Sequence, residues 1–378
     1  MQKFEKHSPV VVTEVTTKHE LRQFMQYPNR LYADNPNYIP SFYGDDLSDW
    51  TPGKNPAFDY CEARCWLARR DGEIVGRIGA ILSHKANDKF GTHRMRFSQV
   101  DFVDDSEVSA ALFGTVERWA REKGCDQVHG PLGFTDMDRE GMLVEGFDRR
   151  SLFFTNYNAP YYLEHLTRLG YRKDVDWIEY RITVPEPGGA EAERLHKLSE
   201  FILKRKHLHV ATVHHKSEYG PFVRQVFELV NAAYAPLYGV VELSDEQIER
   251  YANKFIPLVD PDFVCFVVDE QDQLVAFGVT ALDPSVALKH SDGRLFPFGW
   301  AGVLNDLHHS DTLIMLLTAV RPDLQTEGIN AVMMDHVCQS CNRHGVRFAE
   351  TGPMLELNDH ILAQWKRLEK EQHKRRRC

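Results

Sequence analysis

The stretch TLIMLLTAVRPDLQTEGIN, residues 312–330, decides the fold. Residues 312–320 are almost wholly apolar, which predicts a buried strand, and an apolar helical pattern follows over 328–343. Gly328 stands at the turn into that helix, where glycine lets backbone N–H groups converge on one point. Because the positive end of the helix dipole faces the same way, the turn is predicted to form a socket for a diphosphate.

Two common phosphate-binding motifs are absent from this turn. It has no G-K-[ST], which excludes a Walker loop, and no G-x-G-x-x-G, which excludes the dinucleotide-binding turn. The pattern Gln325-x-x-Gly328-x-Asn330 instead resembles the Q/R-x-x-G-x-G/A coenzyme A loop of the GNAT acyltransferase superfamily. Asn330 departs from the glycine or alanine that is usual there, but its N–H remains available.

The resemblance implies that backbone amides of the loop hold the CoA pyrophosphate, with acetyl-CoA or a longer acyl-CoA as co-substrate. The residues expected to bind it are Ala319, Val320, Gln325, Thr326, Glu327, Gly328, Ile329, Asn330 and Asn358. Asn358 has an alternative role, as the cap of a helix over 358–370.

The order of predicted elements occurs twice along the chain. In the first half, strands are predicted at 8–16, 65–69, 73–82, 95–103, 127–131 and 175–184, with helices at 18–28, 106–123 and 160–169. The first helix is expected to end before Pro28, and Ser106 is expected to cap the second. In the second half, strands are predicted at 208–213, 261–268, 273–280, 312–320 and 346–350, with helices at 219–235, 244–255, 328–343 and 358–370.

The segment PEPGG, residues 185–189, is the clearest break in the chain. It divides a domain over 1–185 from a linker and connecting helix over 186–207 and a second domain over 208–378. The stretches GMLVEGFD (141–148), YNAPYY (157–162), NAAYAPLYG (231–239) and ETGPMLELN (350–358) resemble an uncharacterised branch of the GNAT superfamily with two-part chains. The fold class expected is therefore α+β (mixed α/β), as two tandem GNAT-like domains, each a mixed central sheet flanked by helices.

Only the second domain is expected to bind CoA. The equivalent turn in the first half reads VDDSEV, residues 103–108, and has no glycine. It carries the carboxylates of Asp104, Asp105 and Glu107, which would repel a diphosphate. The first domain is therefore predicted to be a degenerate copy without a CoA loop.

Acyl transfer to an amine needs a base for the amine, a donor for the oxyanion and a proton for the leaving thiolate. The resemblance implies a backbone N–H near residues 317–319 as the oxyanion donor, a glutamate as base and a tyrosine after the fifth strand as acid. No tyrosine follows the strand at 346–350. Glu356 is the first candidate base and Glu350 the second, although a carboxylate near a helix N-terminus also has a purely stabilising role.

Aromatic and acidic residues suggest a substrate cleft for a small-molecule or lipid-like amine. The candidates are Glu145, Asp148, Tyr157, Tyr161 and Tyr238. Packing of the aromatic rings in the core and solvation of the acidic loop are the alternative interpretations.

The composition limits the kinds of partner and the cellular location that are expected. With 45 basic and 55 acidic residues the net charge is −10, which argues against nucleic acid as a partner. No apolar run reaches bilayer-spanning length, and no signal peptide is recognised, so a cytoplasmic location is expected. Cys338 and Cys341 fit two partly buried thiols on one helix, and no residues stand at metal-ligand spacing, so no metal is expected.

The sequence therefore predicts a CoA-dependent N-acyltransferase. A non-catalytic CoA-binding or lipid-binding protein of the same fold is the first alternative, since the expected tyrosine is missing. A transferase that uses aminoacyl-tRNA is the second, and the net charge speaks against it. The run KRRR (374–377) is expected to be a solvated face or the start of a final strand; a strand supplied by a second copy, in a homodimer, is also open.

Overall fold

The first sheet is built around a hairpin whose turn residues Asp71 and Gly72 both have positive φ, 52° and 86°. Such a turn matches the right-handed twist of its flanking strands. In this computed structural model, which describes residues 8–378, the hairpin joins β2 (Cys61–Arg70) to β3 (Glu73–Ser83). The predicted hairpin is confirmed.

The chain divides into two units by its backbone contacts. The first unit comprises the described residues up to Asp176, together with 288–297 and 374–378, and the second comprises 177–287 and 298–373. β7 (Asp176–Thr183) begins in the first unit and continues in the second, whereas β14 (Lys370–Arg377) begins in the second and ends in the first.

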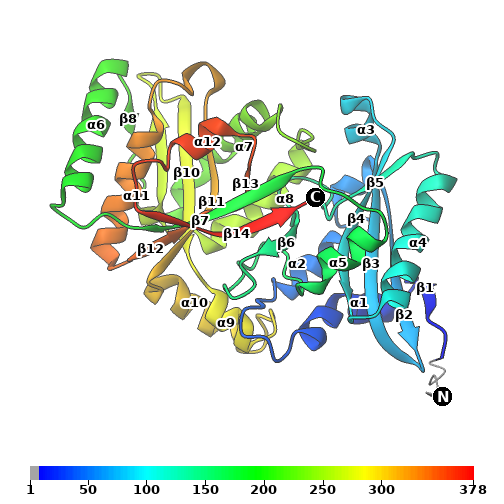
Figure 1. Ribbon diagram of the computed structural model, residues 1–378. Helices are drawn as coiled ribbons and strands as arrows, with labels where there is room; N and C mark the ends of the chain where they lie inside the picture. Colours follow the sequence, from blue (N-terminus) through cyan, green and yellow to red (C-terminus); the bar gives the residue numbers. More distant parts are fainter. Residues whose placement is uncertain (1–7) are drawn as a thin grey trace. The chain divides into compact units, whose positions relative to one another are not determined.

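The other elements of the first unit are drawn in blue to green in Figure 1. They are β1 (Val11–Glu14), α1 (Lys18–Leu31), α2 (Tyr43–Asp49), α3 (His84–Phe90), β4 (Arg94–Phe102), α4 (Ser106–Glu122), β5 (Gln127–His129), β6 (Met142–Glu145) and α5 (Tyr161–Arg168). The sheet has the order β1-β2-β3-β4-β5 and is antiparallel except between β4 and β5. The mixed sheet expected from the sequence is therefore present.

The side chains of β2 point alternately to the two faces of the first sheet, and helices cover both faces. Trp66 and Ala68 pack in one core with α4 and α5, whereas Cys65 and Leu67 pack in another with α1. Alternate residues of a strand point to opposite faces, so this strand, which is apolar at successive positions, is buried on both sides.

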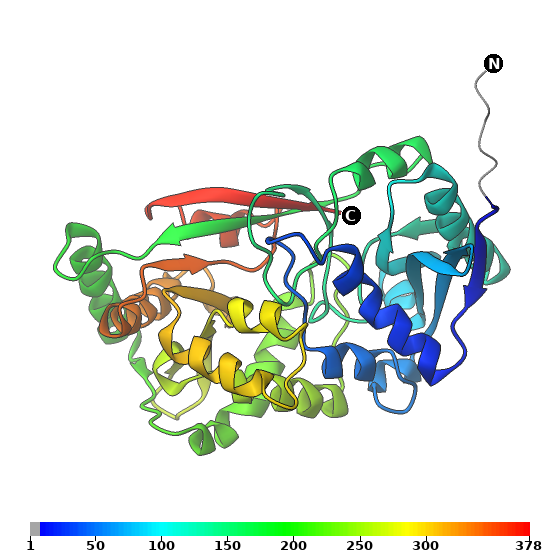
Figure 2. The same cartoon turned by 90° about the horizontal axis from the view of Figure 1, so that it is seen from below.

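The second unit repeats the element order of the first. Its elements are α6 (Ala190–Lys206), β8 (His209–Val210), α7 (Gly220–Tyr234), α8 (Asp245–Phe255), β9 (Val264–Val268), β10 (Leu274–Leu282), α9 (Ser285–His290), α10 (Gly299–His309), β11 (Thr312–Val320), α11 (Asn330–His344), β12 (Phe348–Glu350), β13 (Met354–Leu355) and α12 (Asp359–Ala363). Its strands are ordered β7-β12-β11-β10-β9-β8, with β11 and β12 parallel. Figure 2 shows the same elements from below.

Three local predictions are wrong. The first helix does not end before Pro28 but runs through it to Leu31, because the buried face of α1 compensates for the hydrogen bond that proline removes. Asp105, not Ser106, caps α4, since its carboxylate accepts from two backbone N–H groups. The helix predicted over 358–370 ends at Ala363, and α9 and α10 have no counterpart in the sequence prediction.

The C-terminal run KRRR is a strand and not a solvated face. β14 pairs with β6, Lys374 and Arg376 are buried, and the Arg376 guanidinium donates to the carbonyl of Asn156. Arg377 donates to both carboxylate oxygens of Asp176, at 2.8 and 2.9 Å. Asp176 is itself only 1% exposed, so the end of the chain is fixed within the first unit by a buried ion pair.

Candidate functional site

The turn between β11 and α11 leaves a helix N-terminus open to solvent. Ile329 is the N-cap residue of α11, and no side chain caps it. Within residues 8–378, the N–H groups of Gly328, Ile329 and Asn330 have no hydrogen-bond acceptor. Gly328 and the residues before it are exposed, so an anion from solvent can reach these donors.

Gly328 adopts a backbone conformation that other residues rarely reach. Its φ is +81°, and a Cβ at this position would lie 3.1 Å from the Cδ1 atom of Ile202 on α6. Both facts favour glycine, because the left-handed region strains L-residues and α6 leaves little room. The turn therefore exposes main-chain atoms, and its role as a diphosphate cradle stays a prediction.

Side chains shape this loop rather than fill it. The amide of Gln325 donates to the carbonyl of Val320 at 3.3 Å, which fixes the start of the turn. Glu327 forms an ion pair with Lys206 at 2.6 Å, and the hydrogen bond and charge of Lys206 lower the pKa of that carboxyl. The one carboxylate next to Gly328 is thus neutralised, which favours a phosphate group there. Thr326 is exposed, whereas the side chains of Ala319 and Val320 are buried, so these two offer only backbone atoms.

β11 has an open edge next to this loop. Its parallel pairing with β12 ends at Ile314 and Glu350, although β11 itself continues to Val320. On its other side β11 pairs with β10, with an irregularity opposite Val279 and Thr280 that leaves Leu316 without a partner. The edge from 315 to 319 can therefore offer backbone donors and acceptors to an extended ligand that carries amides.

A tyrosine reaches this edge from a helix. The hydroxyl of Tyr234, near the end of α7, donates to the carbonyl of Thr318 at 2.8 Å. The sequence reasoning looked for a tyrosine only after the strand at 346–350 and missed this one. The signal was present in NAAYAPLYG (231–239), but only the fold shows that α7 packs against β11.

Two apolar cavities are both lined in part by Leu317. The first, of about 90 Å³, includes Met315, Leu317, Asn330, Met333, Ala349 and Trp365. The second, of about 60 Å³, includes Tyr219, Phe227, Phe255, Phe266, Val279 and Leu317. Both adjoin the open part of β11, so an apolar group held there has space on either side of Leu317.

Of the two predicted bases, Glu350 lies at the fork between β11 and β12, the point where their pairing ends. It is the last residue of β12, opposite Ile314, and its side chain is 13% exposed. The Nε2 atom of His373 lies 3.9 Å from its carboxylate, a contact that the sequence did not indicate. Glu356 follows β13 and lines neither cavity. The side-chain oxygen of Asn358 accepts from the N–H of Ile361 at 3.3 Å and so caps α12.

The equivalent turn of the first unit is closed by its own side chain. Asp105 accepts from the N–H groups of Glu107 and Val108, at 2.8 and 3.3 Å, and forms an ion pair with Arg70. The donors that are open in α11 are therefore occupied in α4. The edge of β4 is also occupied, because the backbone N–H of Phe102 donates to the hydroxyl of Tyr162 at 2.7 Å.

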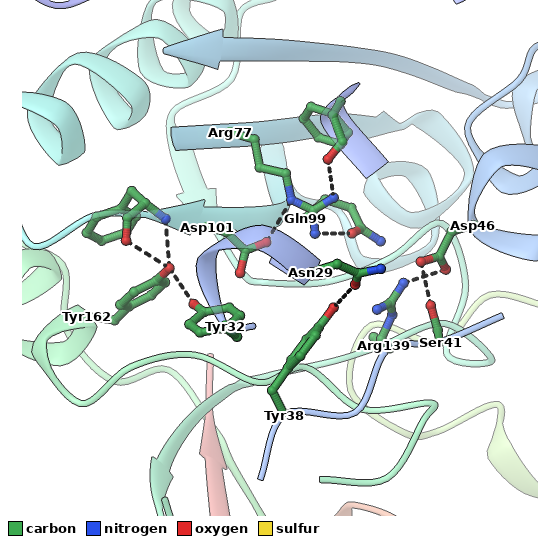
Figure 3. A network of polar contacts seen from close by, with 12 residues as sticks. Asn29, Tyr32, Tyr38, Ser41, Asp46, Arg77, Gln99, Asp101, Arg139 and Tyr162 are labelled. Atoms are coloured by element: carbon green, nitrogen blue, oxygen red, sulfur yellow. Dashed lines mark hydrogen bonds and ion pairs between the residues drawn. The ribbon is translucent and has the colours of Figure 1, made fainter. Parts of the chain in front are cut away.

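A buried polar network lies beside β4, as Figure 3 shows. The Arg77 guanidinium donates to Asp101 at 2.7 Å and to Gln99 at 3.0 Å, and both charged residues are 4% exposed. Burial raises the pKa of Asp101, and the charge of Arg77 opposes that rise. Gln99 has a φ of 47° at a bulge opposite β3, comparable to the irregularity in β11. Sequence reasoning missed this pair, although Arg77 and Asp101 each interrupt an apolar strand.

The five predicted cleft residues lie in different places. Tyr157 accepts from the Asn35 amide at 2.6 Å and lines a small cavity of about 20 Å³ in the first unit. Tyr161 packs against the core of that unit, Glu145 forms an ion pair with Arg375 at 3.2 Å, and Asp148 is exposed beside Arg149. Tyr238 belongs to the second unit, where its ring contacts Trp177.

The two helical thiols are buried, as the sequence indicated. Burial raises the pKa of Cys338 to about 11 and that of Cys341 to about 12, so both remain protonated at neutral pH. Both line the larger apolar cavity. Among residues 8–378, no group of three or more potential metal ligands is found.

The chain has the fold of tandem GNAT acetyltransferases. A tandem GNAT protein from the clavulanic acid biosynthesis pathway matches 97% of each chain with a TM-score of 0.54 and 13% identity. A GCN5-related glucosamine N-acetyltransferase region of a fungal multi-domain enzyme also gives a TM-score of 0.54, at 11% identity, over 98% of this chain and 38% of that one. The chain thus spans well under half of that fungal protein.

Two bacterial proteins are similar in sequence. Protein YghO of Escherichia coli K12 is 27% identical over 97% of this chain and 94% of its own length. A protein named bacterial ceramide synthase, from Caulobacter vibrioides, is 28% identical over 78% of this chain and 75% of its own length. No family model matches the chain. In the part of the chain that the structure describes, no helix is both long and apolar enough to cross a membrane.

Proposed function

We propose that the chain is a CoA-dependent N-acyltransferase that moves an acetyl or longer acyl group from acyl-CoA to an amine. The observation that carries the proposal is the open N-terminus of α11, directly after a strand with an open edge. Its counterpart in the first unit is closed by Asp105, so one CoA site per chain is expected.

The residues of the turn at Gly328 fit the diphosphate of CoA. The N–H groups of Gly328, Ile329 and Asn330 would hold the diphosphate, and Lys206 would offset the charge of the neighbouring Glu327. The open edge of β11 offers its backbone groups to the amide-bearing arm of the coenzyme. Acyl-CoA supplies the acyl group already activated as a thioester, so the protein needs to orient it and manage protons.

Two side chains are assigned to proton transfer. Glu350, at the fork of β11 and β12, is the proposed general base that takes a proton from the attacking amine. Tyr234, whose hydroxyl already lies against β11, is the proposed proton donor to the departing thiolate. Glu356 remains the second candidate base, because it follows β13, which pairs with β7 and not with β11.

The acceptor is proposed to be a lipid-like amine. The two cavities that Leu317 helps to line are apolar, which suits a hydrocarbon chain on the acyl donor, the acceptor or both. The name of the Caulobacter relative supports this direction, because a ceramide is a lipid amide.

The test combines binding and turnover on the full chain. Calorimetry with CoA should give one site per chain, and acetyl-CoA or longer acyl-CoAs should release thiol when an amine is added. CoA binding without thiol release over a panel of simple and long-chain amines would leave a CoA-binding protein and contradict the enzyme. Absence of CoA binding would contradict both.

A further inference from the structure

One exposed segment carries large apolar side chains and no charge. It is FPFGWAGVL, residues 296–304, which we name the aromatic segment. Phe296 and Phe298 are each 81% exposed, Trp300 is 47% exposed and Leu304 is 45% exposed. Large apolar side chains are costly to expose together, so such a group indicates a surface that meets an apolar partner.

The helix that follows holds this segment in place. α10, gold in Figure 2, packs its buried residues Val303 and Leu307 toward the sheet of the second unit, where it contacts β10. Trp300 and Leu304 are four residues apart and therefore share the opposite, exposed face of the helix. The aromatic segment is thus anchored at its helical end and exposed along its length.

Few charged groups flank the segment. Asp306, the acidic residue of α10, accepts from the N–H of Ala287 at 2.7 Å. Exposed Arg294 precedes the segment and exposed His308 and His309 follow it, while Asp292 is the acidic neighbour of Arg294. With histidine neutral at pH 7, the formal charge beside the segment is that of Arg294 and Asp292 together, and it cancels.

The size of the apolar surface distinguishes between partners. At roughly 150–250 Å² for an aromatic side chain, the three rings present about 400 Å² at their exposures. A stable protein interface needs about 800 Å² from each partner. Exposed aromatic side chains, with tryptophan among them, are instead typical of segments that insert shallowly at a bilayer surface.

We propose that the aromatic segment docks this protein on the surface of a lipid bilayer, with the rings of Phe296, Phe298 and Trp300 at the level of the lipid headgroups. This inference does not depend on the acyltransferase proposal. It requires only that the rings exchange water for the interfacial region of the lipid.

Trp300 makes the proposal directly measurable. The other five of the six tryptophans are at most 6% exposed, so changes at the surface are reported by Trp300. The full chain is mixed with vesicles of phosphatidylcholine, alone or with phosphatidylglycerol, and vesicles with brominated acyl chains act as quenchers. Sedimentation with vesicles, a blue shift and bromine quenching of the emission are expected, all persisting at high salt because insertion is apolar.

The double variant Phe296→Ser/Phe298→Ser should lower vesicle binding at least tenfold. Phe90→Ser, which removes an exposed ring from α3, should bind like the unchanged chain. Thermal melting of all three proteins checks that they are folded. Failure of the unchanged chain to sediment with either vesicle, or undiminished binding by the double variant, overturns the proposal. So does a dimer in solution that the double variant dissociates, because the segment then meets a second copy.

Discussion

Ile314 and Glu350 form the last pair between the parallel strands β11 and β12. Beyond this pair β11 continues past Leu317 to Val320, paired with β10 on its other side, and the turn at Gly328 follows. The proposed base on β12, the open edge of β11 and the anion cradle therefore follow one another in the direction of β11.

Replacing Glu350 by glutamine removes the proposed base and keeps the shape of the side chain. We expect kcat to fall by about 10² to 10⁴, the range for loss of a general base. The dissociation constant for CoA should not change. Thiol release and calorimetry measure the two effects, with Glu356→Gln as the matched variant. If Glu356→Gln loses turnover and Glu350→Gln does not, the roles are reversed.

A hydroxyl is removed from the open edge by the substitution Tyr234→Phe. The ring remains, so packing of α7 should be kept, but the hydrogen bond to Thr318 is lost. We expect a fall in kcat with an altered basic limb of the pH–rate profile, and little change in KM. A uniform loss at every pH would mean that Tyr234 acts only in packing.

The anion cradle is tested by Gly328→Asp. The aspartate would meet Ile202, strain the positive φ and place a negative charge at the diphosphate. CoA affinity should fall by at least tenfold in calorimetry. Gly345→Asp is the matched control, because Gly345 ends the same helix with a φ of +70° and has no neighbouring atom within 4 Å of a Cβ. Equal losses in the two variants would point to strain rather than to the cradle.

The preference of the enzyme for one acyl chain length over another should depend on Leu317. Leu317 pairs with Val279, which lines the cavity of about 60 Å³, so a tryptophan at position 317 would fill part of that cavity. Turnover with long acyl-CoAs should fall more than turnover with acetyl-CoA, so the ratio of the two kcat/KM values is the measurement. An unchanged ratio would show that neither the acyl nor the acceptor chain occupies this cavity.

The ion pair of Asp176 should make the first unit sensitive to acid. Burial would raise the pKa of Asp176, but hydrogen bonds and attraction from Arg377 and Lys173 outweigh it and lower the pKa. A lowered pKa stabilises the fold above the usual aspartate pKa, and this is lost as the pH falls toward the folded value. Asp176→Asn should cost about 3 kcal/mol near neutral pH in denaturant unfolding, because Arg375 and Arg377 lose the buried carboxylate with which they pair. The cost should shrink in acid; a cost that is constant with pH would contradict this account.

Local pattern predicted much of the fold. The hairpin at Asp71, the strand at 312–320 and the glycine turn at Gly328 were visible because each depends on a few neighbouring residues. Missed features depend on contacts distant in sequence. Arg77 finds Asp101 on another strand, and Lys374 is buried only because β14 enters the first unit. Tyr234 belongs to the open edge only because α7 crosses β11.

The path of β14 has a consequence for biosynthesis. Residues 374–378 complete the first unit, yet the ribosome makes them only after every residue of the second. A nascent chain therefore carries a first unit that lacks its last strand pairing with β6 and the arginines that neutralise Asp176. Truncated products therefore keep Asp176 with Lys173 but without Arg375 and Arg377, and cellular quality control should degrade them first.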